Sequence, residues 1–189
     1  MLLNGVRTVP AATTRGLSGG RDQGERGMAV SLRESVQVVS DPRGLDAAVE
    51  EVFQMMLGIR CPRSHEAPAP VQGESVTAVV GFGGLLSGAC VFRSRSDVAI
   101  RIAAQMTGME FGDVDDTVKD AIGEICNMLA GAWKGKDPEL AAHCGLSVPA
   151  VITGRDYNLH VQAPEFQLNH NYTFADSQFA VTILCDGLQ

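Results

Sequence analysis

The chain is poor in aromatic residues and has no cluster of basic ones. Aromatic side chains make up 5% of its 189 residues, whereas proteins that stack nucleic-acid bases present several of them on one surface. Lysine and arginine are scattered along the chain and total 15 against 22 acidic residues, which gives a formal net charge of −7. Because neither a basic patch nor a stacking surface is present, nucleic-acid binding is not expected.

Long apolar runs and paired cysteines are also missing. No stretch approaches the roughly 20 apolar residues that a membrane span requires, so no membrane association is expected. The five cysteines are widely spaced and never form a C-x-x-C pair, which favours a reducing, cytoplasmic location over a disulfide framework. No metal site is expected either, because the histidines never pair at a spacing typical of metal ligands: His65, His143, His160 and His170.

Residues 1–30 differ in composition from everything that follows. They are rich in glycine, arginine and threonine, without a helical or alternating apolar pattern, which is typical of a disordered segment. The sequence leaves open whether this is a disordered N-terminal tail or whether Met28 is the true start. One well-cored domain is expected over residues 31–189, which is long enough to bury a core.

Three helices are predicted from capping residues and apolar periodicity. Asp41 followed by Pro42 is a typical helix start, and Gly58 is a typical stop. Apolar residues recur at helical spacing between them. The same reasoning predicts the other two helices over 96–108, with Ser96-Asp97 as the cap, and over 115–133.

Strands are predicted between and after these helices: 75–82, 89–93, 146–153, 158–163 and 178–185. The first two form a hairpin through a glycine-rich turn at 83–88, after a polar connector at 60–72. Residues 134–145 are expected to be a loop. This order predicts an α+β domain, with the helices packed on one face of a mostly antiparallel sheet.

An internal repeat links the first and last helices. Residues 51–58 and 124–131 align without a gap and read EVFQMMLG and EICNMLAG. Chance similarity between two amphipathic helices is one explanation, and an internal duplication that creates a pseudo-two-fold domain is the one we expect. The copies differ at polar positions, where Gln54 stands opposite Asn127 and Ala47 opposite Asp120.

The last helix carries a polar face suited to contact with another molecule. At about 100° per residue, Asp120, Glu124, Asn127 and Gly131 fall in one narrow arc. The apolar positions lie on the other side: Val118, Ile122, Ile125, Leu129 and Ala132. Asp120 also fits a first-turn acid that stabilises the helix dipole, and Gly131 also fits a weak point near the helix end.

These residues resemble the signature of a known family. Asp120-x3-Glu124-x2-Asn127 is followed, with 21 residues in between, by Pro149 in a Ser-Val-Pro-Ala-Val-Ile-Thr-Gly phrase. This pattern resembles that of the CheC/CheX phosphatases of response regulators, over the chain from about Ser31 to its end. The resemblance is closer to CheX because only the later helix keeps the Glu/Asn pair, and it implies a CheX-like fold and a homodimer.

The resemblance implies hydrolysis of the aspartyl phosphate on a CheY-like receiver domain. Asn127 would orient the water, and Glu124 would pair with a lysine of the receiver. Asp120, Gly131 and Pro149 would contribute to partner binding, although Pro149 also fits a structural role at a strand edge. Mg²⁺ would belong to the receiver, so the chain needs no cofactor of its own. The alternatives are an inactive CheX-like module that binds a receiver or flagellar-switch protein, and a purely structural dimerisation domain.

Overall fold

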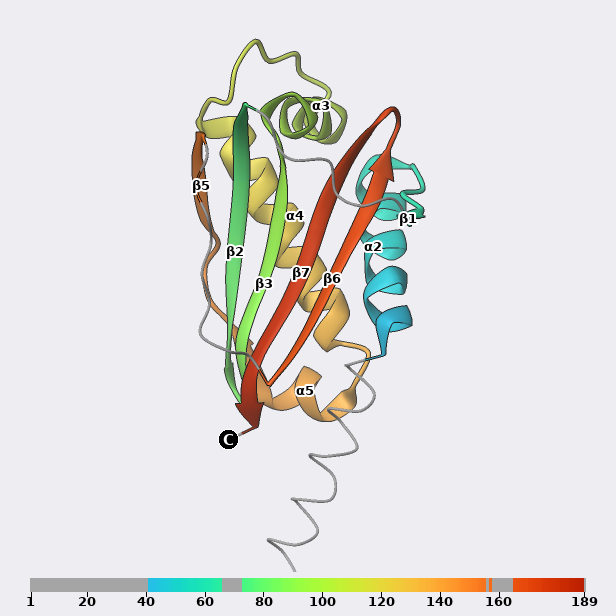
Figure 1. The fold of residues 1–189 in the computed structure, drawn as a ribbon, viewed down its shortest axis with the longest axis vertical. Helices are drawn as coiled ribbons and strands as arrows, with labels where there is room; N and C mark the ends of the chain where they lie inside the picture. Colours follow the sequence, from blue (N-terminus) through green and yellow to red (C-terminus); the bar gives the residue numbers. More distant parts are fainter. Residues whose placement is uncertain (1–40, 66–72, 156, 158–164, 189) are drawn as a thin grey trace, which may run out of the picture.

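One antiparallel sheet forms the centre of the structure, and helices cover one of its faces (Figure 1). The computed structural model describes residues 41–65, 73–155, 157 and 165–188. The helices are α2 (Pro42–Leu57), α3 (Ser96–Thr107), α4 (Asp116–Lys134) and α5 (Pro138–His143). The strands are β1 (Arg63–Ser64), β2 (Glu74–Gly84), β3 (Leu86–Arg95), β4 (Cys144–Leu146), β5 (Ala150–Arg155), β6 (Phe166–Phe174) and β7 (Ser177–Leu188). The predicted fold class is confirmed.

The order of the strands has an internal symmetry. The sheet runs β1-β6-β7-β3-β2-β4, and β5 also pairs with β2. Strand β1 follows α2 and pairs with the second hairpin, β6–β7, whereas β5 follows α4 and pairs with the first hairpin, β2–β3. Strands β3 and β7 meet antiparallel in the middle. This arrangement is the pseudo-two-fold duplication that the helix repeat predicts, with α3, α5 and β4 as additions.

The core lies between the sheet and the helices. In Figure 1, α4 runs diagonally across the sheet behind β2 and β3, with α2 beside it and α3 across one end. Alternate residues of β2 point inward and are buried, as the two-residue period of a strand requires: Val76, Ala78, Val80 and Phe82. Phe82 lies against the buried Trp133 of α4, with ring centroids 5.2 Å apart. Each large side chain buried in this way contributes about 1.5–3 kcal/mol.

The few aromatic residues concentrate in this core. Under α2, the ring of Phe179 stacks on those of Phe53 and Phe92, with centroids 4.7 and 5.1 Å apart. The ring centroid of Tyr172 lies 5.5 Å from that of Phe179. Aromatic pairs at such distances contribute beyond their buried area. The scarcity of aromatics at the surface thus goes together with a cluster that fixes α2 on β7.

A buried polar cluster holds α2 against β6. His170 is 4% exposed, and its Nδ1 lies 2.9 Å from Oδ1 of Asp46, which also accepts a 2.8 Å hydrogen bond from the Tyr172 hydroxyl. Arg63 of β1 lies 3.6 Å from the other carboxylate oxygen of Asp46. Burial and the Asp46 carboxylate raise the pKa of Tyr172 far above its ordinary value, which keeps the hydroxyl protonated as a donor. The Asp46 side of α2 therefore faces the sheet.

The helix ends mostly follow the predictions. The Asp41 side chain accepts from the backbone N–H of Arg43, and Asp115 caps α4 by accepting from Val118. Gly58 ends α2 in the left-handed conformation, with φ +68°. The prediction for α3 was wrong in its cap, because Arg95 occupies that position and its side chain forms no capping hydrogen bond.

Several predicted boundaries were also wrong. The expected loop at 134–145 contains α5 and β4, and Asp137 caps α5 through Leu140. The hairpin strands β2 and β3 are longer than predicted, and the turn between them is Leu85 alone. The strand expected over 146–153 is divided into β4 and β5, with Pro149 between them. Strand β7 confirms the prediction for 178–185.

Two predictions concern residues outside the described ranges, and two strands were missed, of which β1 lies inside the connector expected at 60–72. The strand predicted at 158–163 and the tail at 1–30 lie outside the described residues. Strand β6 was not predicted, because its outward positions carry turn-forming asparagines and its inward positions include a histidine and a tyrosine: Asn169, Asn171, His170 and Tyr172. Within the described ranges, no helix is long and apolar enough to cross a membrane.

Candidate functional site

Helix α4 presents the predicted polar face to solvent. Asp120 and Glu124 are exposed, whereas Asn127 and Gly131 are half-buried. The opposite face packs on the sheet through nine buried residues: Val118, Ala121, Ile122, Gly123, Ile125, Cys126, Leu129, Ala130 and Trp133. The sheet therefore fixes the rotation of α4, and that rotation points the carboxylate and the carboxamide outward.

The polar side chains of this face have no partner in the part of the chain that the structure describes. Among the described residues, the side chains of Asp120, Glu124 and Asn127 form neither a hydrogen bond nor an ion pair. Other acids of the helical layer do: Asp116 lies 2.9 Å from Nζ of Lys119, which lowers the pKa of Asp116 through that hydrogen bond. The face thus carries acceptor and donor groups available to a second molecule.

Pro149 packs against α4 at Gly123. A Cβ placed on Gly123 would lie 3.3 Å from Cβ of Pro149 and 3.4 Å from Cγ2 of Val151. Absence of a side chain at Gly123 therefore lets the start of β5 pack directly against α4, one turn before Asn127. This contact supports the structural interpretation of Pro149 over a direct role at the polar face.

Gly123 was missed as a site residue by sequence reasoning. A signal for it exists, because a glycine in the interior of a helix costs about 1 kcal/mol relative to alanine and calls for a packing reason. The pattern of the polar face indicated its neighbour Glu124, whereas Gly123 lies on the buried side of the helix. The close approach of Pro149 supplies that reason, and only the tertiary structure reveals it.

Gly131 lies inside the helix and has open space in front of it. A Cβ built there would meet nothing within 4 Å, and the Gly131 carbonyl accepts a 3.0 Å hydrogen bond from the N–H of Gly135. The helix therefore continues past Gly131, which rules out the helix stop that Gly58 provides in the first copy. No packing inside the described chain requires a glycine at this position.

The corresponding face of α2 carries the aligned residues, but its carboxylate has a partner. Glu51, which aligns with Glu124, is held by Nζ of Lys136 at 2.7 Å. Gln54, which aligns with Asn127, is exposed. Within the described ranges, the carboxylate of α4 therefore has no partner, whereas that of α2 is engaged.

Nucleophile and metal chemistry find no support in the described residues. Cys126, next to Asn127, is fully buried, and its thiol donates to the carbonyls of Ala78 and Cys90. Burial raises the pKa of Cys185 to about 12, which keeps that thiol protonated. Within the described ranges, no group of three or more histidine, cysteine or acidic residues could hold a metal ion.

Comparison with known proteins gives consistent matches. The family model described as chemotaxis phosphatase CheX matches residues 76–171, a range that includes α4 and Pro149. A curated relative, the CheY-P phosphatase CheX of Thermotoga maritima, is 32% identical over 120 residues, which cover 61% of this chain and 76% of that protein.

Solved structures match over most of the described fold. A CheC-like superfamily protein from Shewanella sp. PV-4 aligns with a TM-score of 0.65 at 16% identity, over 77% of this chain and 96% of that one. A chain from the CheX-CheY-BeF3-Mg²⁺ complex of Borrelia burgdorferi aligns with a TM-score of 0.63 at 19% identity, over 77% and 97%.

The duplicated sheet with its two related helices is thus the fold of the CheC-like superfamily. Within that class, the family model and the Thermotoga relative place the chain more narrowly. The chain belongs to the chemotaxis phosphatase CheX family.

Proposed function

We propose that the protein hydrolyses the aspartyl phosphate of a phosphorylated CheY-like receiver domain. The observation that carries this proposal is the exposed Glu124 and the half-buried Asn127 on one face of α4, neither with a side-chain partner among the described residues. Membership of the CheX family supports it, as do the name of the Thermotoga relative and the solved complex of a CheX with CheY.

Asn127 is proposed to orient the hydrolytic water. Its carboxamide oxygen can accept a hydrogen bond from water while the NH₂ group donates to a phosphoryl oxygen. Water positioned in this way attacks phosphorus in line with the departing carboxylate, as the water-orienting glutamine of small GTPases arranges. The P–O bond to the aspartate breaks, and phosphate and the free carboxylate result.

Glu124 is proposed to fix the register of the complex by pairing with a lysine of the receiver. It precedes Asn127 by three residues, so both side chains project from one side of the helix. Charge-assisted hydrogen bonds of this kind are stronger than neutral ones. Mg²⁺ would be held by the receiver and would neutralise charge on the phosphoryl group there.

Supporting roles are proposed for the remaining residues of the face. Gly131 would let the receiver backbone approach α4, which agrees with the open space in front of it. Asp120 would add negative charge beside Glu124. Pro149 would act through Gly123, by holding α4 at its position on β5. A homodimer, expected from the family resemblance, is part of the same proposal and is measurable by light scattering.

The test is hydrolysis and binding measured on the same variant. Asn127→Ala should slow release of phosphate from the receiver about 100-fold or more, while its affinity for the beryllofluoride-activated receiver stays within a few-fold of wild type. Equal rates for wild type and Asn127→Ala would contradict the enzymatic proposal. Binding by wild type without any acceleration of hydrolysis would support an inactive receiver-binding module instead.

A further inference from the structure

Methionine is concentrated in the helical layer of this protein. The methionines among the described residues all lie in helices α2, α3 and α4 or in the turn that follows α3: Met55, Met56, Met106, Met109 and Met128. Two of them are among the most exposed large apolar side chains, Met55 at 65% and Met109 at 53%. Flexible, polarisable thioethers gathered at one surface are typical of adaptable protein-binding sites.

Met55 lies on the flank of α2 that faces α4. It is nine residues after Asp46, or about half a turn away around the helix, and Asp46 faces β6 through His170. Met55 also follows Glu51 by one turn, and Glu51 reaches Lys136, just beyond α4. These two contacts fix the rotation of α2 and direct Met55 toward α4.

Met128 lies on the matching flank of α4. Gly123 marks the side of α4 that packs on β5, through Pro149. Met128 is about 140° away around the helix, on the side of α2, and it follows Glu124 by one turn. Met55 and Met128 are aligned positions of the repeat, so the two related helices present methionine toward each other.

The end of α3 brings Met109 to the same region. The side chain of Gln105 in α3 donates a 2.9 Å hydrogen bond to the carbonyl of Leu57, the last residue of α2. Met109 follows two residues after α3 ends, and its N–H donates to the Thr107 hydroxyl at 3.2 Å. The ends of α2 and α3 are thus joined, and Met109 extends the apolar surface that Met55 begins.

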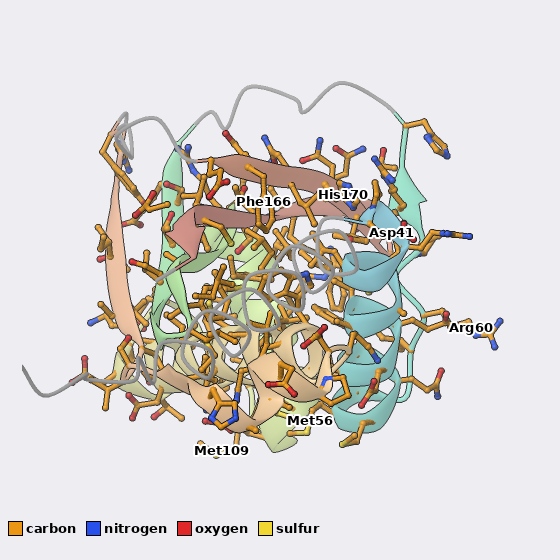
Figure 2. All side chains as sticks on the ribbon, turned by 90° about the horizontal axis from the view of Figure 1, so that it is seen from below. Asp41, Met56, Arg60, Met109, Phe166 and His170 are labelled. Atoms are coloured by element: carbon orange, nitrogen blue, oxygen red, sulfur yellow. The ribbon has the colours of Figure 1, made fainter. Side chains whose placement is uncertain are left out.

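Figure 2 shows on which side of the molecule the labelled methionines lie. Met56 and Met109 project from the helical side of the molecule, while Phe166 and His170 lie on the side of the sheet. The helical side also carries the exposed Glu124 and the half-buried Asn127. The methionines therefore border the polar face of α4 on its α2 side.

On the basis of the phosphatase function proposed above, we propose that Met55 and Met109, with the partly buried Met128, form the apolar docking surface for the receiver domain. Two exposed polar side chains give little net affinity in water, because their interactions with solvent are lost on binding. Stable recognition needs apolar anchors buried next to them. Met55 and Met109 are the large exposed apolar side chains of the described helical layer, and Met128 follows Glu124 by one turn of α4.

The occupant is the receiver rather than a second copy of this chain because the surface adjoins the groups that act on the receiver. A second copy would cover Glu124 and Asn127 and would prevent the proposed hydrolysis. Asp120 and Glu124 also make this surface acidic, which complements a basic group on a receiver and opposes contact with an identical surface.

The experiment compares full-length variants in steady-state hydrolysis of a phosphorylated CheY-like receiver from the same organism. Met55→Lys with Met109→Lys should raise KM and the Kd for the Mg²⁺- and beryllofluoride-bound receiver at least about tenfold, and leave kcat within about twofold. The double leucine variant should keep the wild-type KM. Ala141→Lys with Ala142→Lys, at exposed positions of α5 at the other end of the sheet from α3, adds the same two charges and should change neither constant.

Two outcomes would overturn the inference. One is a double lysine variant with wild-type KM and Kd; the other is a variant that changes the oligomeric state in light scattering but leaves KM unchanged, which would assign the methionines to self-association. Failure of the proposed function is distinguishable, because wild type would then accelerate no phosphate release. The Kd for the beryllofluoride-bound receiver tests the docking surface separately.

Discussion

Helices α2 and α4 share one amphipathic pattern and present different surfaces. Both bury their apolar side on the same sheet. The carboxylate of Glu51 is engaged by Lys136 at 2.7 Å, whereas that of Glu124 has no partner within the described residues. The duplication has thus kept the positions that build the core, while the polar positions have diverged.

The ends of the two helices differ as well. Gly58 adopts φ +68° and ends α2, whereas the aligned Gly131 lies within α4, which continues to Lys134. The polar face of α4 is therefore longer than that of α2 and includes the open position at Gly131. The same apolar pattern thus supports one face without a carboxylate partner among the described residues and one whose carboxylate is engaged.

The largest expected effect comes from exchanging the two carboxamides. Asn127→Gln should slow receiver dephosphorylation by about 100-fold, because one additional methylene displaces the amide by more than 1 Å from the water it orients. Gln54→Asn should leave the rate unchanged. Single-turnover assays with phosphorylated receiver measure both.

A gain of activity from Gln54→Asn in the Asn127→Ala background would contradict this asymmetry. It would show that α2 retains a working docking surface in spite of the Glu51–Lys136 contact. Circular dichroism provides the folding control, and both substitutions should leave the spectrum unchanged since the two side chains are at least partly exposed.

The next effect comes from the two glutamates. Glu124→Gln should weaken binding of the activated receiver about tenfold, through loss of one charge-assisted contact at an interface. Glu51→Gln should leave that affinity unchanged, since its carboxylate already pairs within the chain. Isothermal titration at two salt concentrations measures both, and only Glu124 should contribute to the salt dependence.

The difference between helices α2 and α4 could be predicted in part from the sequence. The 3.6-residue period identified which side of α4 is buried, and the gap-free alignment identified Gln54 as the counterpart of Asn127. Those are properties of a helix and need no knowledge of its surroundings. The pairing of β1 with β6 and of β5 with β2, which makes the domain symmetric, agrees with the predicted duplication.

Contacts between distant segments could not be predicted in this way. The Glu51–Lys136 pair joins residues 85 positions apart, and the approach of Pro149 to Gly123 depends on where β5 joins the sheet. Strand β6 was missed because His170 and Tyr172 occupy inward positions, where their polarity is satisfied by Asp46 on another element. Local pattern cannot show that such a partner exists.

The two aligned glycines should respond to alanine in opposite directions. Gly131→Ala should stabilise the protein by up to about 1 kcal/mol, because alanine is the better helix former and its Cβ meets nothing within 4 Å. Gly58→Ala should destabilise it by about 1 kcal/mol, because alanine is strained at φ +68°. Urea denaturation measures both. Gly131→Ala should also weaken receiver binding a few-fold, and unchanged affinity would remove Gly131 from the proposed interface.

The smallest expected effect concerns the ion pair that distinguishes the two helices. Lys136→Ala removes the partner of Glu51, yet both side chains are partly exposed, 33% and 49%, so the loss of stability should be only about 0.5 kcal/mol. The informative measurement on this variant is the number of receivers that each chain binds. If the Lys136 contact is what makes the two faces differ, this variant should bind a second receiver weakly, whereas wild type binds one. If the stoichiometry stays at one receiver per chain, the difference lies in Gln54 and in the early end of α2 at Gly58, and the ion pair only stabilises the packing of the two helices.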